Sequence, residues 1–311
     1  MSFTELRHGC KINYSLKVGK RLPSGYHEIE SIFLPVGCPY DRIVISRSTG
    51  KKDITVRFVG EDGIEGRFSA IDPEDNSLVH AYRKYAELTS FRPSLDITVF
   101  KMIPAGGGLG GGSANAAALL LHLQKETENS GGRPLSGQAL SQAAASIGAD
   151  VPFFLSNKPS YVSGTGEVIR PVENPVRERH LLLVCPDLSI ATGWAYAELD
   201  RRRQIKNVFG DNGQKLCKNS PEQGLTYEMH QANYSSPDGL LEYGNDFEEV
   251  VFSKYSSLAR IKKQLLDSGA ATARLSGTGA TIFGFFREAA DAKAVEVDLA
   301  EQGLLVYSQR I

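Results

Sequence analysis

The stretch from Gly106 to Gly112 is glycine at six of its seven positions, and Ser113 follows it at the start of an Ala- and Leu-rich run. Glycine costs backbone entropy, about 0.5–1 kcal/mol per residue relative to alanine in regular structure. A chain that accepts this cost needs its backbone to come close to something. Before the glycines, LDITVFKMI alternates in polarity as a strand does and stops at Pro104. After them, SANAAALLLHLQKE favours a helix that Ser113 can cap.

A strand, a glycine-rich turn and a helix N-terminus together form an anion site. The first N–H groups of a helix have no partner within it, and the positive end of the helix dipole lies there. Glycines let a phosphate lie against the main chain. The sequence therefore predicts a phosphate-binding loop, and the alternative is a crowded structural turn that binds nothing.

Three common loop types fit this stretch poorly. A Walker A loop requires Lys after its last glycine, whereas Ser113 follows Gly112. A dinucleotide fingerprint GxGxxG is present from Gly106 to Gly111, but its ribose-binding acid should end a second strand about 20 residues on. The acid at that distance, Glu126, lies in polar sequence beyond the predicted helix. A protein-kinase loop needs HRD and DFG motifs, and the sequence has neither.

The composition bounds the class of protein. A chain of 311 residues is long for one hydrophobic core and favours two domains. The 35 basic and 36 acidic residues give a net charge of −1, so we expect neither nucleic acid nor a membrane as a partner. The four cysteines have the spacing of neither a zinc site nor a disulfide framework. The N-terminal residues lack the apolar core of a signal peptide. We expect a soluble cytoplasmic protein.

Periodicity predicts the elements that position the loop. Strands are expected at 12–16, 31–36, 41–48, 53–60 and 95–103, and helices at 76–88, 113–126 and 136–148. Further on, a strand is expected at 179–186, a helix at 256–270, strands at 271–277 and 280–286 around a tight turn, a helix at 287–303 and a strand at 304–309. We predict one domain over 1–167 and a second, ferredoxin-like α+β domain over 168–311.

The second domain contains a polar stretch near 200–238, which we interpret mostly as a surface insertion or mobile loop. Its DRRRQ segment is expected to be a solvated face and not a ligand site.

The loop PAGGGLGGGSANAAA closely resembles the phosphate-binding motif of the GHMP small-molecule kinases. Two further segments resemble family motifs and fall in the family's order: GCKINYSLKVGKRLPSGYHEIESIF near the start and ARLSGTGATIFGFF near the end. The resemblance implies a mixed α+β fold of two domains, the first similar to ribosomal protein S5 domain 2. It also implies ATP as the phosphoryl donor, with Mg²⁺, and a monomer or homodimer.

Within the family, KIN followed by GYHEIESIF is similar to the 4-diphosphocytidyl-2-C-methyl-D-erythritol kinases. That group transfers the ATP γ-phosphate to the 2-hydroxyl of a cytidine diphosphate-linked methylerythritol in the non-mevalonate isoprenoid pathway. GADVPFFL and NDFEEVVF also resemble its segments. Cys10, Ser24 and Ala191 depart from its usual pattern, and 200–238 is longer than expected.

The resemblance assigns roles to particular residues. Asp150 is expected to take the proton of the acceptor hydroxyl, and Lys11 to be its electrostatic partner. The nucleotide positions are Asn76, beside the adenine, and Pro104, Gly106, Gly107, Gly108, Leu109, Gly110, Gly111, Gly112, Ser113 and Ala114. The acceptor positions are Asn13, Tyr26, His27, Thr192 and Tyr196, with Gly277 and Gly279 at the floor of the cleft. Ser113 can hold Mg²⁺ through water, and no side chain is expected to be a direct metal ligand.

Tyr26 and His27 are the discriminating pair. An aromatic ring can stack on a cytosine, worth roughly 1–3 kcal/mol per base in nucleic-acid complexes, and an imidazole can hydrogen-bond with the edge of the base. Tyr196 would cover the other face.

Three alternatives stay open at this point. Another GHMP kinase, for homoserine, mevalonate or a sugar, would share the glycine loop but have no use for a Tyr-His pair that binds cytosine. An NAD(P)-dependent oxidoreductase would use GxGxxG and bind nicotinamide. A nucleotide-binding regulator without catalysis would need neither Lys11 nor Asp150.

Overall fold

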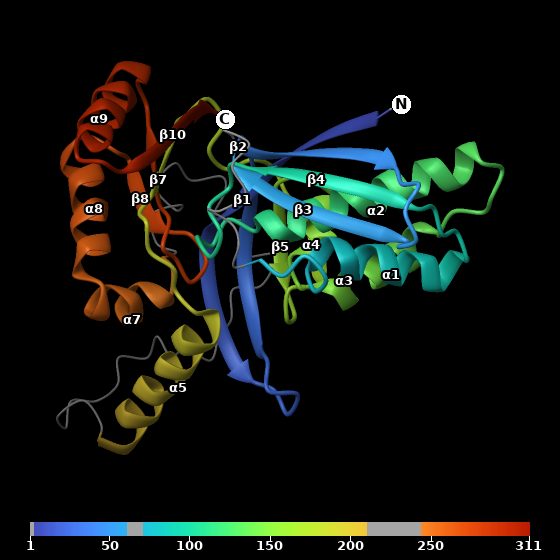
Figure 1. Ribbon diagram of the computed structural model, residues 1–311. Coiled ribbons are helices and arrows are strands. Elements are labelled where there is room, and N and C mark those ends of the chain that lie inside the picture. Colours follow the sequence, from blue (N-terminus) through green and yellow to red (C-terminus); the bar gives the residue numbers. More distant parts are fainter. Residues whose placement is uncertain (1–2, 61–70, 210–243) are drawn as a thin grey trace.

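The computed structural model describes residues 3–60, 71–209 and 244–311. Two sheets lie side by side, each covered by its own helices (Figure 1). The strands of the first sheet are β1 (Phe3–Arg21), β2 (His27–Arg47), β3 (Ile54–Gly60), β4 (Leu95–Lys101), β5 (Ser160–Ser163) and β6 (Val168–Pro171). The helices on its face are α1 (Ser77–Thr89), α2 (Gly111–Asn129), α3 (Gly137–Ile147) and α4 (Val151–Ser156).

Strand β2 organises the first sheet. It pairs antiparallel with β1 along its length, with β5 near its start and with β4 towards its end, while β3 adds to β4 in parallel. In β4 the buried positions alternate with half-buried ones, as expected for a strand with one face on the core. The carboxyl end of β4 delivers the chain to the glycine loop, and α2 carries it away.

The second part of the chain forms a four-stranded antiparallel sheet in the order β10-β7-β9-β8. Its strands are β7 (His180–Cys185), β8 (Thr272–Leu275), β9 (Ile282–Phe286) and β10 (Leu305–Arg310), and its helices are α7 (Phe247–Lys254), α8 (Ser256–Asp267) and α9 (Ala289–Glu301). Counted within this part, the strand order is four-one-three-two, which is the ferredoxin-like arrangement. The predicted mixed α+β fold in two parts is confirmed.

A shared core joins the two sheets. Apolar side chains of β1 and β2 lie in one buried cluster with those of β7 and β9, among them Ile12, Leu34, Leu181 and Phe283. Dispersion and burial of this cluster hold the sheets in one relative position. The glycine loop lies where they meet.

The structure corrects several predicted boundaries. The strands predicted at 31–36 and 41–48 are one strand, β2. Lys11 lies within β1 and not at its start. Helix α2 begins at Gly111, so Ser113 is in its first turn and Gly110 holds the N-cap position, because left-handed Gly110 (φ 72°) turns the chain into the helix earlier. The first sheet includes β6 as far as Pro171, and the domain limit at residue 167 stays a prediction.

The polar stretch from residue 200 was interpreted incorrectly where the structure describes it. Helix α5 (Thr192–Phe209) runs through its first part, beside the ends of β1 and β2 (Figure 1). The DRRRQ segment is only partly solvated, since Arg202 and Arg203 are half-buried and make tertiary contacts. The rest of that stretch, 210–238, lies outside the described residues.

No helix in the described part of the chain is long and apolar enough to cross a membrane. Cys10, Cys38 and Cys185 are free thiols, and Cys217 lies outside the described residues.

Candidate active site

The glycine loop lines a cavity of about 580 Å³, within the usual range for a small-molecule site. The N–H of Ala114 makes the first intrahelical bond of α2, to the carbonyl of Gly110 at 2.9 Å. The N–H groups of Gly111, Gly112 and Ser113 come before it and have no partner within the helix. These amides and the helix dipole give this end of the cavity the chemistry of a phosphate site.

The glycines serve two different purposes. Gly106, Gly108 and Gly110 have φ between 70° and 76°, where a side chain is strained. At Gly108 a Cβ would also lie 2.1 Å from the carbonyl oxygen of Ser276, in the turn between β8 and β9. At Gly112 a Cβ would meet only the Ser77 hydroxyl, at 3.4 Å. Close packing against the second sheet therefore explains why residue 108 is glycine. At Gly112 the backbone is instead open toward the cavity.

A buried carboxylate holds both ends of the loop. Asp41 is fully buried, and its Oδ1 accepts from the N–H groups of Met102 and Ile103, both at 3.0 Å, just before the loop. Its Oδ2 accepts from the amide of Asn115 on α2, at 2.8 Å, and pairs with Lys101. Charge-assisted bonds of this kind are about twice as strong as neutral ones. Asp41 thus fixes the entry and exit of the loop relative to each other.

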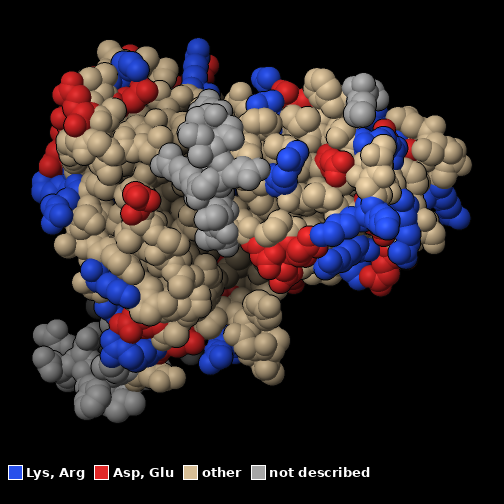
Figure 2. Space-filling model, viewed as in Figure 1, with Lys and Arg blue, Asp and Glu red and all other residues tan. Residues whose placement is uncertain are grey.

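The visible rim of the cavity is acidic. Asp72 and Asp75 line it, and acidic side chains gather beside the hollow between the two parts of the molecule, next to the start of α1 (Figure 2). Attraction for phosphate must therefore come mainly from the amides, because the charge of buried Lys101 is already paired with Asp41. Asn76 lines the cavity too, but its side chain already caps α1, accepting from the N–H groups of Leu78 and Val79. Its predicted place beside the adenine stays a prediction.

Lys11 and Asp150 form an ion pair beside the loop. The Lys11 Nζ lies 3.3 Å from Asp150 Oδ2 and donates to Asn13 Oδ1 at 2.5 Å. The Lys11 side chain is 5% exposed and that of Asp150 is 29% exposed, so the carboxylate is the partner that a ligand can reach. The backbone N–H of Lys11 donates to the carbonyl of Leu109 at 2.9 Å, which joins this strand to the loop. Asp150 occupies the N-cap position of α4 without a capping bond, so its carboxylate is not used in holding that helix.

Asn13 connects the pair to the second sheet. Its side chain donates to the Ser31 hydroxyl at 3.0 Å, and its Oδ1 lies 3.4 Å from the Cβ position of Gly277. Gly277 and Gly279 have φ of 57° and 92° and form the predicted tight turn between β8 and β9. This turn packs directly on the glycine loop, through the Ser276 hydroxyl bonded to the carbonyl of Gly108 at 3.0 Å.

Two of the predicted acceptor residues, His27 at the start of β2 and Tyr196 on α5, are in direct contact. The His27 ring stacks on Tyr196, with centroids 4.8 Å apart and an interplanar angle of 25°, and Tyr26 is 69% exposed next to it. Burial and, second, the negative charge of Asp150 raise the pKa of Tyr196 to about 12. The Thr192 hydroxyl lies 3.3 Å from that of Thr278. The charge of the Asp150 carboxylate therefore reaches the Tyr196 hydroxyl.

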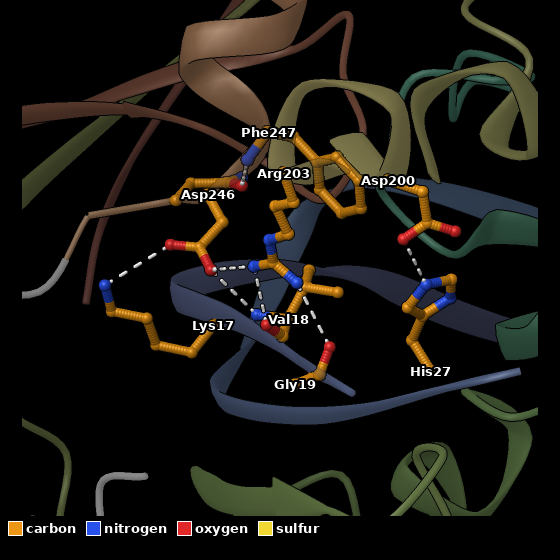
Figure 3. A network of polar contacts seen from close by, with 9 residues as sticks. Lys17, Val18, Gly19, His27, Asp200, Arg203, Asp246 and Phe247 are labelled. Carbon is orange, nitrogen blue, oxygen red and sulfur yellow. Dashed lines mark hydrogen bonds and ion pairs between the residues drawn. The ribbon is translucent and has the colours of Figure 1, made fainter. Parts of the chain in front are cut away.

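A polar network anchors α5 over this region (Figure 3). Asp200 Oδ1 lies 2.8 Å from the Nε2 of His27. Arg203 donates to the carbonyls of Val18 and Gly19, at 2.7 and 3.1 Å, and pairs with Asp246 at 3.3 Å. Sequence reasoning missed Asp200 and the Asp41 cluster. The only local signal for Asp200 was its position four residues after Tyr196, on the same face of a helix.

Comparison with known proteins places the chain in a family. Residues 76–158 match the GHMP kinases N terminal domain, and residues 228–304 match the GHMP kinases C terminal domain. The chain is 40% identical over 306 residues to the 4-diphosphocytidyl-2-C-methyl-D-erythritol kinase of Nitratidesulfovibrio vulgaris, covering 97% of this chain and 96% of that protein.

Two crystal structures share the fold. A 4-(cytidine 5'-diphospho)-2C-methyl-D-erythritol kinase has a TM-score of 0.70 at 24% identity, over 98% of both chains. The homoserine kinase of Cytophaga hutchinsonii has a TM-score of 0.69 at 16% identity, over 100% of this chain and 95% of that one. The two TM-scores are nearly equal, so the fold alone does not select between these two families, whereas the 40% sequence identity favours the first. The chain therefore belongs to the GHMP kinases and, within them, to the family of 4-diphosphocytidyl-2-C-methyl-D-erythritol kinases.

Proposed function

We propose that this protein is an ATP-dependent kinase that phosphorylates the 2-hydroxyl of 4-diphosphocytidyl-2-C-methyl-D-erythritol, in the non-mevalonate route to isoprenoid precursors. The observation that carries the proposal is the position of the Lys11–Asp150 pair. It touches the glycine loop through the backbone bond to Leu109 and lies close enough to Tyr196 to affect its pKa. A phosphoryl donor and an acceptor would meet at this pair.

The donor side is the glycine loop and the first turn of α2. Backbone amides of Gly111, Gly112 and Ser113 would hold the ATP phosphates. No group of three or more His, Cys, Asp or Glu side chains within the described ranges could hold a metal by itself. Mg²⁺ suits a site of this kind, because it commonly binds through substrate phosphates and few protein ligands. It would enter with ATP near the Ser113 hydroxyl and neutralise charge on the phosphoryl group.

At the acceptor, Asp150 would accept the proton of the 2-hydroxyl as that oxygen attacks the γ-phosphorus. Lys11 is held by Asn13 and by Asp150 itself, so its charge is fixed where negative charge develops in the transition state. Transfer is direct, with no phosphoenzyme. The cytosine would lie against Tyr26, with His27 at its edge. Tyr196, expected to cover the other face of the base, stacks on the His27 ring and would support that ring.

A coupled ADP-release assay with Mg·ATP tests this proposal, with the cytidyl substrate, homoserine and mevalonate as parallel acceptors. ADP release with the cytidyl substrate alone is the expected result. Release with another acceptor would retain the Lys11–Asp150 chemistry but reject the cytosine pocket. If no acceptor causes ADP release, the protein has a nucleotide site but does not catalyse this phosphoryl transfer.

A further inference from the structure

Helix α5 presents one polar face to the first sheet. Tyr196, Asp200 and Arg203 follow one another at spacings of four and three residues, which places them on the same side of the helix. All three contact the start of β2 or the end of β1: Tyr196 and Asp200 through His27, and Arg203 through the carbonyls of Val18 and Gly19. The face is therefore a docking surface for His27.

His27 is held on two sides by this face. Its ring lies flat on Tyr196, which in turn packs edge-on against Phe247 with centroids 4.8 Å apart. Its edge meets Asp200 at 2.8 Å, and the His27 side chain is only 5% exposed (Figure 3). Turning the ring over about its Cβ–Cγ bond would keep the stack on Tyr196 but would move Nε2 away from Asp200, so the hydrogen bond fixes which edge faces the carboxylate.

The bond to Asp200 determines which ring nitrogen carries the proton. An ionised carboxylate only accepts hydrogen bonds, so the Nε2 of His27 must be the donor. In the neutral imidazole the other nitrogen, Nδ1, is then an acceptor. The exocyclic amino group of cytosine is a donor, whereas uracil and thymine carry an acceptor oxygen at that place. An Nδ1 acceptor can therefore accept a hydrogen bond from the amino group of cytosine, whereas it repels the oxygen of uracil.

We propose that Asp200 is a positioning residue that fixes the tautomer of His27 and thereby makes the acceptor pocket select a cytosine over a uracil nucleotide. This inference rests on the proposed function, in which His27 lies at the edge of the base. Asp200 does not touch the substrate. It acts through the proton on Nε2, and Arg203 keeps α5 in register so that the carboxylate stays in place.

Calorimetric titration with CDP and with UDP tests the inference, with the ATP site filled by a non-hydrolysable ATP analogue. The wild type should bind CDP more tightly. In Asp200→Asn the amide can donate to Nε2 and allow the reversed tautomer, so the ratio of the two affinities should fall about tenfold or more. Glu198→Gln is the matched control, because Glu198 pairs with Arg201 and Arg202 on the same helix and does not contact His27. It should leave the ratio unchanged.

Long-range ¹H–¹⁵N correlation spectra of the imidazoles report the tautomer of His27 in the wild-type protein itself. In the wild type, the His27 resonances, assigned with His27→Gln, should show a protonated Nε2 and an unprotonated Nδ1. The opposite tautomer would overturn the inference. The inference would also be overturned if Asp200→Asn lowered the affinities for CDP and UDP by the same factor, because that result indicates a merely structural role. A wild type that does not distinguish CDP from UDP would instead refute the cytidyl pocket of the proposed function, and the inference with it.

Discussion

Replacing Gly108 with alanine tests the interpretation that the loop is glycine-rich partly for its contact with the second sheet. The new Cβ would lie 2.1 Å from the carbonyl oxygen of Ser276, and real Cβ atoms do not come closer than 3.0 Å, so the two backbones must separate by about 0.9 Å. Neither atom belongs to a side chain that can rotate away. Residue 108 also has a φ of 76°, which costs alanine about 1–2 kcal/mol.

Two losses follow from this geometry. The left-handed strain, about 1–2 kcal/mol, and the overpacking, about 1–3 kcal/mol, together should lower the free energy of unfolding by about 2–5 kcal/mol. A shift of about 1 Å at a reacting centre costs about 100-fold in rate, and Gly108 lies one residue from the carbonyl that holds Lys11. Urea denaturation measures the first effect, and turnover in the ADP-release assay measures the second.

Gly112→Ala is the control for stability, because it adds the same methyl group to the same loop. Its Cβ meets nothing closer than 3.4 Å, and its backbone is not left-handed. Its free energy of unfolding should stay the same or rise by up to about 1 kcal/mol. If Gly108→Ala keeps wild-type stability and turnover, or if the two variants lose stability equally, the contact with Ser276 does not explain the glycine.

Three further predictions follow from the same structure. Asp150→Ala should lower turnover by about 10²–10⁴-fold while calorimetry shows ATP still bound, and near-normal turnover would remove Asp150 as the base. Asp41→Asn leaves buried Lys101 without its counter-charge and should lower the free energy of unfolding, measured in urea, by about 3–5 kcal/mol. The control Asp267→Asn loses only an exposed ion pair and should lower it by less than about 1 kcal/mol. Equal losses in the two variants would contradict the role of Asp41. Burial lowers the pKa of His8, so the unfolded chain binds its proton first as the pH falls below about 6.5, and stability drops there by at most about 1.4 kcal/mol per pH unit. In His8→Phe the urea midpoint should change less between pH 7.5 and 5.5, and an unchanged difference would show that another group causes the loss.

Strong local patterns in the sequence predicted most of the fold. The alternation of 95–103 and the Ala- and Leu-rich run after the glycines correctly placed β4 and α2 on either side of the loop. The helix, hairpin, helix and strand at the end of the chain gave the ferredoxin-like sheet. These elements are predictable because their apolar periodicity comes from one face on a core. Family resemblance, and not periodicity, directed attention to Lys11 and Asp150, which the structure brings within 3.3 Å.

Helix α5 shows where this reasoning fails. Its sequence is rich in charges, and much of the face that it turns toward β1 and β2 is polar, so apolar periodicity is weak. The contacts that hold it are with His27, Val18 and Asp246, which are far away in the sequence. Local pattern cannot distinguish such a helix from a solvated loop.

The sequence by itself determined that a phosphate-binding turn lies between a strand and a helix, because glycine content and helix preference are local properties. Only the tertiary structure decided why Gly108 must be a glycine and what holds the loop in place. Gly108 is set by a carbonyl at residue 276, and the loop is held by a carboxylate at residue 41. Likewise Asp200 is one acid among several on a charged helix until the fold places His27 against it. A close approach or a hydrogen bond between distant residues leaves no periodic trace in the chain, and it exists only once the two sheets have packed together.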